Sequence, residues 1–150
     1  MEDVRYMQQA LAAAREAATM GDVPVGAVIV DWAASRIVAI AGNRVEQDHD
    51  PTAHAELLAI RMAARGLSAP RLSDCDLYVT LDPCAMCAQA IAFARIRRLF
   101  FGAYDPKGGG VEHGARIFEQ ATCNHAPEIV GGLKEGECAE MLRAFFAARR

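Results

Sequence analysis

This sequence predicts an α/β fold, in which helices cover both faces of a mixed, mostly parallel five-stranded sheet to give three α/β/α layers. Two observations support the prediction. Apolar runs typical of buried strands alternate along the chain with apolar residues at helical spacing, which is the pattern of a sheet covered by helices. No repeat, low-complexity stretch or linker divides the 150 residues, so residues 1–150 are expected to form a single domain.

The first half of the chain contains the signals for two helices and two strands. A helix opens the chain and ends at Gly21–Pro24, because apolar residues recur at helical spacing: Val4, Met7, Leu11, Ala14 and Ala18. A continuous apolar run then predicts a strand over Val25–Asp31, and a second strand follows at Arg36–Ala41. A loop from Gly42 to Asp50 leads into a helix from about Pro51 to Arg65, since proline suits a first helical turn.

The second half repeats the alternation of strand and helix. A segment rich in β-forming residues predicts a strand at Leu77–Leu81, followed by a helix over Cys84–Ala94 and a strand at Arg98–Ala103. After a glycine-rich loop come a short helix near Ala115–Ala121 and an apolar segment at Glu128–Leu133. The last helix carries an apolar stripe at positions i, i+3, i+4, i+7 and i+8, formed by Cys138, Met141, Leu142, Phe145 and Phe146.

Two short motifs, thirty positions apart, are the strongest functional signal. His54 lies two residues before Glu56, and Cys84 and Cys87 form a Pro-Cys-x-x-Cys motif. One imidazole and two thiolates can supply three of the four tetrahedral ligands of zinc, which leaves one position open for water. Because Glu56 is a carboxylate that can move the protons of that water, the motifs predict a hydrolytic zinc centre.

The predicted layout explains how the two motifs could meet. Each motif begins a helix that follows a strand, and parallel strands place such helix starts at the same edge of a sheet, where α/β proteins bind ligands. In the middle of a helix, Glu56 would point roughly 200° away from His54. In a first turn, with the metal beyond the end of the helix, both side chains could reach it.

A Cys-x-x-Cys pair by itself also occurs in structural metal sites and in redox proteins. A structural zinc site normally uses four protein ligands, and no fourth ligand stands out near this set. A thioredoxin-like redox pair also begins a helix after a strand, but it does not require His54 and Glu56 on a second helix. Taken together, the two motifs favour catalytic zinc, while a structural metal site and a redox pair remain the alternatives.

Composition limits the cellular setting and the partners. The net charge of −3 provides no general attraction for a polyanion, so any contact with nucleic acid must be local. The acidic start, Met1-Glu2-Asp3, does not resemble an export signal, and the apolar run Val23–Val30 is too short to span a membrane. A cytoplasmic protein without a membrane partner is therefore expected, and five cysteines, an odd number, favour reduced thiols over a disulfide framework.

Several other conspicuous residues have simpler interpretations than a functional one. His49, His113 and His125 have no companions at metal-ligand spacing, so loop or capping roles are expected. Gly108–Gly110 lacks the ending of a phosphate-binding loop and is predicted to be a flexible surface loop, although its position after a strand would also suit a gate beside the site.

The combination of His-x-Glu with Pro-Cys-x-x-Cys resembles the zinc-dependent nucleoside and nucleobase deaminases. Further segments resemble the bacterial tRNA adenosine deaminases and occur in the same order: Asp22–Val28, Gly42–Arg44, Asp50–Glu56, Tyr78–Leu81 and Phe101–Ala103. The resemblance covers nearly the whole chain. It implies a cytidine-deaminase-like fold and the conversion of the wobble adenosine of a tRNA to inosine.

The resemblance also implies the chemistry of the centre. His54, Cys84 and Cys87 would hold one zinc ion per chain, and Glu56 would be the catalytic proton carrier. Glu56 would take a proton from water, deliver it to the purine N1, and later protonate the amine that leaves C6. The reactive base would have to leave its stack, which an anticodon loop permits at little cost.

Substrate contacts are likewise implied by the resemblance. Asn43 matches an asparagine that hydrogen-bonds the target nucleoside, and Val23 and Val28 match apolar residues that line the pocket. Asp105 matches a position that touches the flanking nucleotides. The family is homodimeric, and the anticodon loop of the tRNA binds across the boundary between subunits.

Two other functions are compatible with the sequence. A deaminase of a free base or nucleoside, of guanine, cytosine or adenosine type, would use the same zinc chemistry, and the modest charge and the Lys107–Val111 loop favour it. Asn43 and the Asp22–Val28 segment favour RNA. An RNA-binding module with a degenerate site is a further alternative, but no residue that the chemistry requires is missing.

Overall fold

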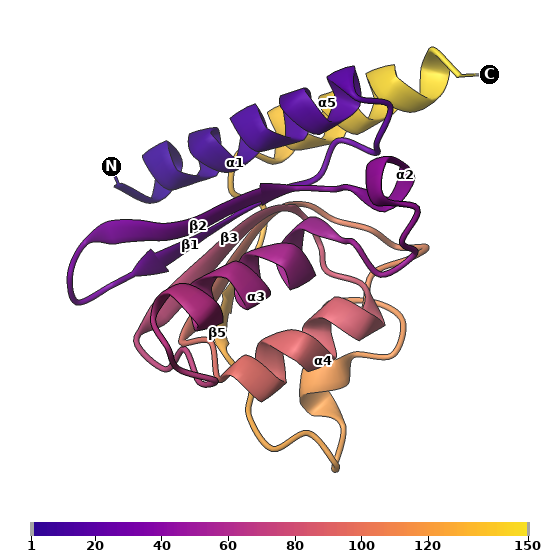
Figure 1. The fold of residues 1–150 in the computed structure, drawn as a ribbon. Helices are drawn as coiled ribbons and strands as arrows, with labels where there is room; N and C mark the ends of the chain where they lie inside the picture. The colour runs from indigo at the N-terminus through magenta and orange to yellow at the C-terminus, as the bar shows by residue number, and fades with distance from the viewer. Residues whose placement is uncertain (1, 150) are drawn as a thin grey trace.

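The computed structural model describes residues 2–149, which contain five strands in one sheet (Figure 1). The strands lie in the order β2-β1-β3-β4-β5, and their bounds are β1 Gly26–Asp31, β2 Arg36–Gly42, β3 Cys75–Leu81, β4 Arg98–Ala103 and β5 Glu128–Val130. β1 pairs antiparallel with β2 and β3, whereas the β3–β4 and β4–β5 pairs are parallel. Four strands therefore run in one direction and β1 runs against them, which confirms the mixed, mostly parallel sheet.

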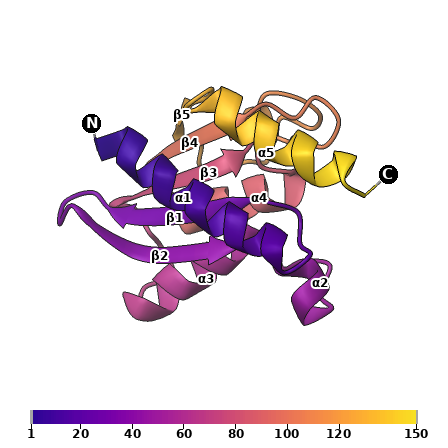
Figure 2. The ribbon, with the colours of Figure 1, turned by 90° about the horizontal axis from the view of Figure 1, so that it is seen from above.

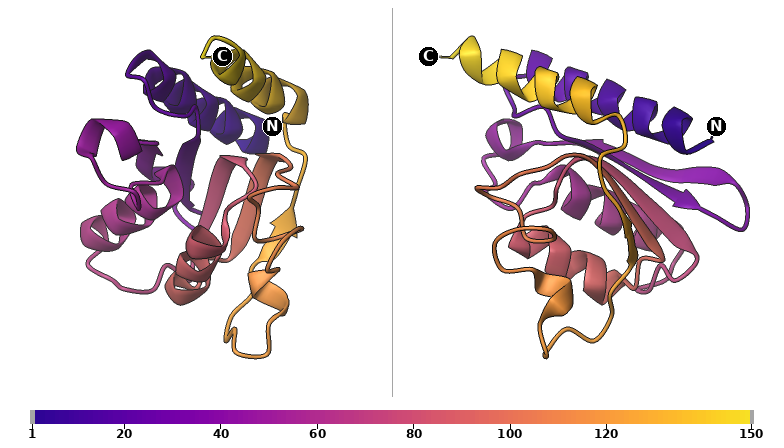
Figure 3. Two further views of the ribbon diagram at one scale, coloured as in Figure 1. Left: turned by 90° about the vertical axis from the view of Figure 1, so that its right-hand side faces the viewer. Right: turned by 180° about the vertical axis from the view of Figure 1, so that it is seen from behind.

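Helices cover both faces of this sheet, as predicted. α1 (Glu2–Thr19) and α5 (Glu135–Ala147) lie alongside each other over one face, as Figure 2 shows from above. α3 (Ala55–Gly66) and α4 (Ala85–Ala94) cover the opposite face, so that the view along the sheet in Figure 3 shows three layers. A short helix, α2 (Val45–Asp48), and a 3₁₀ turn, η1 (Ile117–Glu119), lie in the connections. None of the helices within residues 2–149 has the length and apolar content needed to cross a membrane.

The alternation of side chains along β1 divides the core into two clusters. Ala27 and Ile29 pack with the alanines of α3 and with α4, whereas Val28 and Val30 pack with α1 and α5. Close approach of α1 requires Gly26, because a Cβ atom there would overlap the carbonyl oxygen of Ala10.

Not all of the apolar stripe predicted for the C-terminal helix is buried in the core. Cys138 and Phe145 are buried, and Met141 and Leu142 are half-buried. Phe146 remains 45% exposed. The stripe is wider than the strip of α5 that contacts the sheet and α1, so its edge stays in solvent.

The helix predicted from about Pro51, α3, begins later than predicted. Pro51 and Thr52 form a turn, and α3 starts at Ala55. The Asp50 carboxylate accepts hydrogen bonds from the backbone N–H of Thr52 at 2.8 Å and from its hydroxyl at 2.7 Å, which holds the chain in a turn and delays the helix. His54 consequently lies just before the helix instead of one turn inside it, and this displacement matters for the site.

Two of the three glycines after β4 are packed, whereas Gly108 is exposed, so the predicted flexible surface loop is wrong for Gly109 and Gly110. Gly109 and Gly110 are buried, and the backbone N–H of Gly110 donates to the carbonyl of Pro83 at 2.7 Å. A Cβ atom at Gly110 would lie 2.5 Å from the backbone nitrogen of Ala85. Glycine is therefore needed here because the loop lies directly against the start of α4.

Candidate active site

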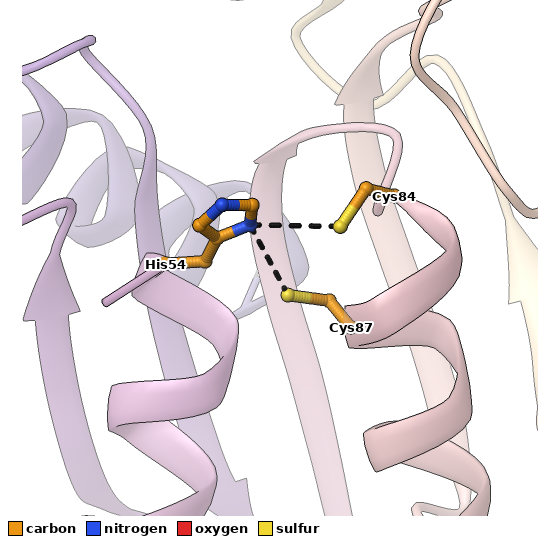
Figure 4. A group of neighbouring side chains, drawn as sticks. All are labelled: His54, Cys84 and Cys87. Atoms are coloured by element: carbon orange, nitrogen blue, oxygen red, sulfur yellow. Dashed lines mark hydrogen bonds between the residues drawn. The ribbon is translucent and has the colours of Figure 1, made fainter. Parts of the chain in front are cut away.

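The candidate site lies at the edge of the sheet where β2, β3 and β4 end and β1 begins. The antiparallel and parallel registers bring Gly26 opposite Gly42 and Leu81 opposite Ala103 at this edge. His54 immediately precedes α3, and Cys84 immediately precedes α4, both with extended backbone at φ −76° and −69°. Because the two helices start side by side, residues far apart in the chain meet here, as the sequence predicts (Figure 4).

The three metal-ligand candidates converge on a common centre. The Nδ1 atom of His54 lies 3.5 Å from the Sγ atom of Cys84 and 3.5 Å from that of Cys87, as the dashed lines in Figure 4 mark. Zinc bonds of about 2.3 Å to sulfur and about 2.0 Å to nitrogen, at the tetrahedral angle, separate such atoms by about 3.5 Å. This is the only trio of ligand groups within 4.8 Å of one another among residues 2–149, and its three atoms are spaced as three ligands of a tetrahedral ion would be.

The two thiols have different proton affinities. A hydrogen bond from the Cys87 thiol, helped by His54 and opposed by burial, lowers the pKa of Cys84 to about 4. The same interaction and the burial of Cys87 raise the pKa of Cys87. The pair therefore holds one proton at neutral pH, and a coordinated divalent cation would displace it, since metal binding deprotonates a ligating thiol.

Glu56 reaches the site because it lies in the first turn of α3. Its side chain is buried and, together with His54 and Cys84, lines the same cavity. Burial is the main reason that the pKa of Glu56 rises to about 7, and the nearby Cys84 thiolate adds to the effect. A carboxyl group that titrates near neutral pH can both accept and donate a proton, which a proton carrier must do. Because α3 starts late, Glu56 lies in its first turn and does not point away from His54 as it would in the middle of a helix.

A cavity of about 290 Å³ opens onto these groups. Its wall contains three acidic groups, one amide, three apolar side chains, two of the candidate ligands and a glycine: Val23, Val25, Asn43, His54, Glu56, Leu81, Asp82, Cys84, Asp105 and Gly108. Apolar surface combined with several converging polar groups is typical of a pocket for a small ligand. The structure therefore brings the predicted residues Asn43, Val23 and Asp105 together around the candidate centre.

Val28 does not belong to this wall, and the prediction that it lines the pocket is wrong. Its side chain is fully buried in the cluster beneath α1 and α5, on the opposite face of the sheet. Val25 lines the cavity instead, together with Leu81, and neither residue is selected by the sequence motifs. A signal for Val25 is nevertheless present, because side chains alternate along a strand, so residues three apart point to opposite faces.

One wall of the cavity is fixed by the segment after β4. The Asp105 carboxylate accepts hydrogen bonds from the backbone N–H groups of Lys107 at 3.2 Å and Gly108 at 2.9 Å. Beneath it, the buried Asp82 carboxylate lies 3.6 Å from Nδ1 of His113. Burial raises the pKa of Asp82, while the imidazole of His113 opposes that rise. His113 thus has the loop role expected of it, although its partner is a pocket residue.

Comparison with known proteins places the chain in a family. Residues 1–103 match the family described as the cytidine and deoxycytidylate deaminase zinc-binding region. The chain is 54% identical over 149 residues to a tRNA-specific adenosine deaminase from Agrobacterium fabrum, a match that covers 99% of this chain and 97% of the relative.

Solved structures show the same relationship. One, from a study of A-to-I editing by tRNA:A34 deaminases at the wobble position of transfer RNA, has a TM-score of 0.88 and 54% identity over 92% of this chain and 99% of that chain. A guanine deaminase from Nitrosomonas europaea shares the fold at a TM-score of 0.83 and 21% identity, over 96% of this chain and 84% of that chain. The chain therefore belongs to the cytidine and deoxycytidylate deaminase zinc-binding family, within the branch of the tRNA-specific adenosine deaminases.

Proposed function

We propose that this protein is a zinc-dependent hydrolase that converts the wobble adenosine of a tRNA to inosine and releases ammonia. The observation on which this depends is that His54, Cys84 and Cys87 converge, and that His54 and Cys84 line one small cavity together with the buried Glu56. Zinc chemistry follows from the ligand set, and the choice of adenosine in RNA follows from near full-length similarity to relatives that carry that name.

Zinc, when bound by His54, Cys84 and Cys87, would supply the Lewis acidity that makes water a nucleophile at neutral pH. The protein residues account for the remaining steps. Glu56 accepts a proton from the attacking water and transfers it to N1 of the purine, so that C6 becomes electrophilic. After addition at C6, Glu56 takes the second proton from the added hydroxyl and gives it to the exocyclic amine, so that the C6–N bond breaks, the C6 carbonyl forms and ammonia leaves. Glu56 ends in its starting protonation state, so the cycle consumes one water and no other reagent.

The walls of the cavity provide a place for the base. Val23, Val25 and Leu81 form apolar surfaces against which the base can pack, while the Asn43 side chain offers both a donor and an acceptor. Asp105 also lines the cavity, where it can contact nucleotides beside the target. Because the cavity admits only a small group, a target nucleotide in RNA must leave its stack, and a loop permits this more readily than a duplex.

A homodimer is the expected assembly. The outward sides of α3 and α4 expose large apolar side chains, with Met62 at 47%, Met86 at 36% and Phe93 at 68% exposure. Exposed apolar residues of this size on neighbouring helices are typical of an interface. Since tRNA is the substrate, we place the enzyme in the cytoplasm. Light scattering of the purified protein tests the assembly, and a monomer at micromolar concentration would contradict it.

A single substrate panel tests the function. Purified zinc-loaded protein is incubated with an anticodon stem-loop carrying adenosine at the wobble position, with the same stem-loop carrying adenosine elsewhere in the loop, and with free adenosine, guanine and cytosine. Inosine should form only at the wobble position, with one ammonia released per inosine. Ammonia from a free base or nucleoside, with the stem-loop unchanged, would instead establish the free-base or nucleoside alternative.

A further inference from the structure

Asp22 is a buried carboxylate close to the cavity that the proposed chemistry does not use. Its side chain is wholly buried and accepts three hydrogen bonds. The donors are the backbone N–H of Glu46 at 2.7 Å, the backbone N–H of Gln47 at 3.3 Å and the side-chain amide of Gln47 at 2.8 Å. All three come from α2, more than twenty residues further along the chain.

These hydrogen bonds supply a cap that α2 cannot make for itself. The residue before the helix, Arg44, makes no side-chain capping hydrogen bond to it. The first backbone N–H groups of a helix need an acceptor, and a carboxylate is favoured there because of the helix dipole. Asp22 is therefore a cap supplied from a distant part of the chain, which fixes α2 in position against the segment between α1 and β1.

Both segments that Asp22 joins carry residues of the cavity wall. Val23 follows Asp22 directly, and Asn43 lies just before α2. A further hydrogen bond connects the two segments, from the backbone N–H of Asn43 to the carbonyl of Val25 at 3.0 Å. The Gln47 amide also donates to the carbonyl of Asn43 at 3.4 Å, which ties Asn43 to α2. The position of Asn43 relative to Val23 thus depends on the hydrogen bonds that Asp22 accepts from α2.

We propose that Asp22 is a positioning residue for the deamination, which acts through Asn43 by fixing α2 and the Val23–Val25 segment against each other. Asp22 belongs neither to the cavity wall nor to the ligand trio, and its role rests on the proposed function. The expected consequence is that the base is held at the correct distance from Glu56. Loss of such positioning can lower catalysis by up to about 100-fold without removing any catalytic group.

Asp22→Asn is the sharpest variant, because it keeps the size of the side chain. The amide has one acceptor oxygen, and its NH₂ group must face donors on α2, so at least one hydrogen bond is lost. Gln47→Ala removes one donor and leaves Asp22 intact, which provides a milder variant if Asp22→Asn folds poorly. Asp31→Asn is the matched control, since Asp31 also accepts a backbone N–H, from Ala34 at 3.2 Å, but in the distant turn between β1 and β2.

The experiment measures kcat, KM, zinc content and the thermal midpoint for each variant, alone and combined with Asn43→Ala. Asp22→Asn should lower kcat/KM by about 10-fold or more with zinc content unchanged, and Gln47→Ala should lower it by a smaller factor. On the Asn43→Ala background, Asp22→Asn should cost less than about twofold, because residues that act through one another are not additive.

Asp31→Asn should leave kcat/KM within about twofold of the parent. The inference is overturned if Asp22→Asn and Gln47→Ala lower the thermal midpoint but leave kcat/KM unchanged, or if the full effect of Asp22→Asn persists without the Asn43 side chain. The cycle is measured on whichever substrate the unmodified protein deaminates. A failure of RNA deamination by the unmodified protein is therefore a separate result, which bears only on the proposed function.

Discussion

The central strand β3 has a buried aspartate at each end, and the two ends differ in how the charge is compensated. Near the start of β3, Asp76 receives two hydrogen bonds from Arg97, at 3.0 and 2.8 Å, and the guanidinium lies 4.1 Å from the centre of the Trp32 ring. Just beyond the other end, the basic group beside Asp82 is the imidazole of His113 at 3.6 Å. Burial raises the pKa of both carboxyl groups, and in each case the neighbouring basic group opposes the rise.

The difference separates what stabilises the fold from what performs chemistry. The Asp76 end is closed by a bidentate ion pair, which compensates the charge of the buried carboxylate. The Asp82 end also contains Glu56 and two thiols, and no guanidinium or ammonium group within residues 2–149 pairs with them. Functional sites are where a fold tolerates polar groups that are not fully satisfied, because such groups are available to a metal and a substrate.

The largest expected effect is on activity, at the Asp82 end of β3, where Glu56 lies. Glu56→Gln should retain zinc and lower kcat by about 10²- to 10⁴-fold, because the amide cannot carry the proton between water, N1 and the amine. Inosine formation on the anticodon stem-loop and zinc content by mass spectrometry measure the two quantities. Turnover within tenfold of the parent would remove Glu56 from the mechanism.

Glu56→Gln should lower activity but raise the stability of the metal-free protein. In the metal-free protein the folded-state pKa of Glu56 is about 7, above its ordinary value of 4.5. Between these two values the unfolded chain loses the proton while the folded protein keeps it, so the free energy of unfolding falls as pH rises from about 4.5 to about 7. Glu56→Gln should remove this contribution and stabilise the metal-free protein at pH 8 by on the order of 1–3 kcal/mol. Urea unfolding at pH 5 and pH 8 measures it, and an equal effect at both values would contradict the assignment.

The second largest effect is on the free energy of unfolding, at the Asp76 end of β3. Arg97→Met keeps the apolar stem but leaves Asp76 buried without its partner, which should lower the free energy of unfolding by about 2–3 kcal/mol, since this pair is not wholly buried. Arg143→Met, which breaks an exposed pair with Glu140, should cost about 1 kcal/mol or less. The kcat/KM value of Arg97→Met, measured well below its thermal midpoint, should be unchanged. A loss of activity without a loss of stability would show that the two ends are not independent.

The third effect concerns thiol reactivity. In metal-free protein the low pKa of Cys84, about 4, makes it a thiolate at pH 6, whereas burial raises the pKa of Cys75 and Cys138 to about 11. Iodoacetamide at pH 6 should therefore modify Cys84 at least about tenfold faster than either buried cysteine. Zinc should protect Cys84, and peptide mapping follows each site. Equal labelling with and without zinc would show that Cys84 is not a ligand.

The ligand residues and the layers of the fold can be predicted from the sequence, whereas the points at which short helices begin cannot. The two motifs predict the zinc trio because ligand chemistry depends on residue type, and the helix and strand periodicity predicts the layers. The late start of α3 escapes prediction, because it depends on the Asp50 side chain competing for the backbone of Thr52. The α2 helix within the predicted Gly42–Asp50 loop escapes it for a similar reason, since its cap, Asp22, is distant in sequence.

The smallest expected effect tests the face of the sheet on which a residue lies. Val28→Ala should lower the free energy of unfolding by about 1–2 kcal/mol through lost burial beneath α1, with KM for the stem-loop unchanged. Val25→Ala should instead raise KM about three- to tenfold, because it removes part of the apolar wall against which the base packs. Unfolding curves and steady-state kinetics on both variants distinguish the two roles. An increase in KM for Val28→Ala comparable to that for Val25→Ala would return Val28 to the pocket and contradict the alternation seen along β1.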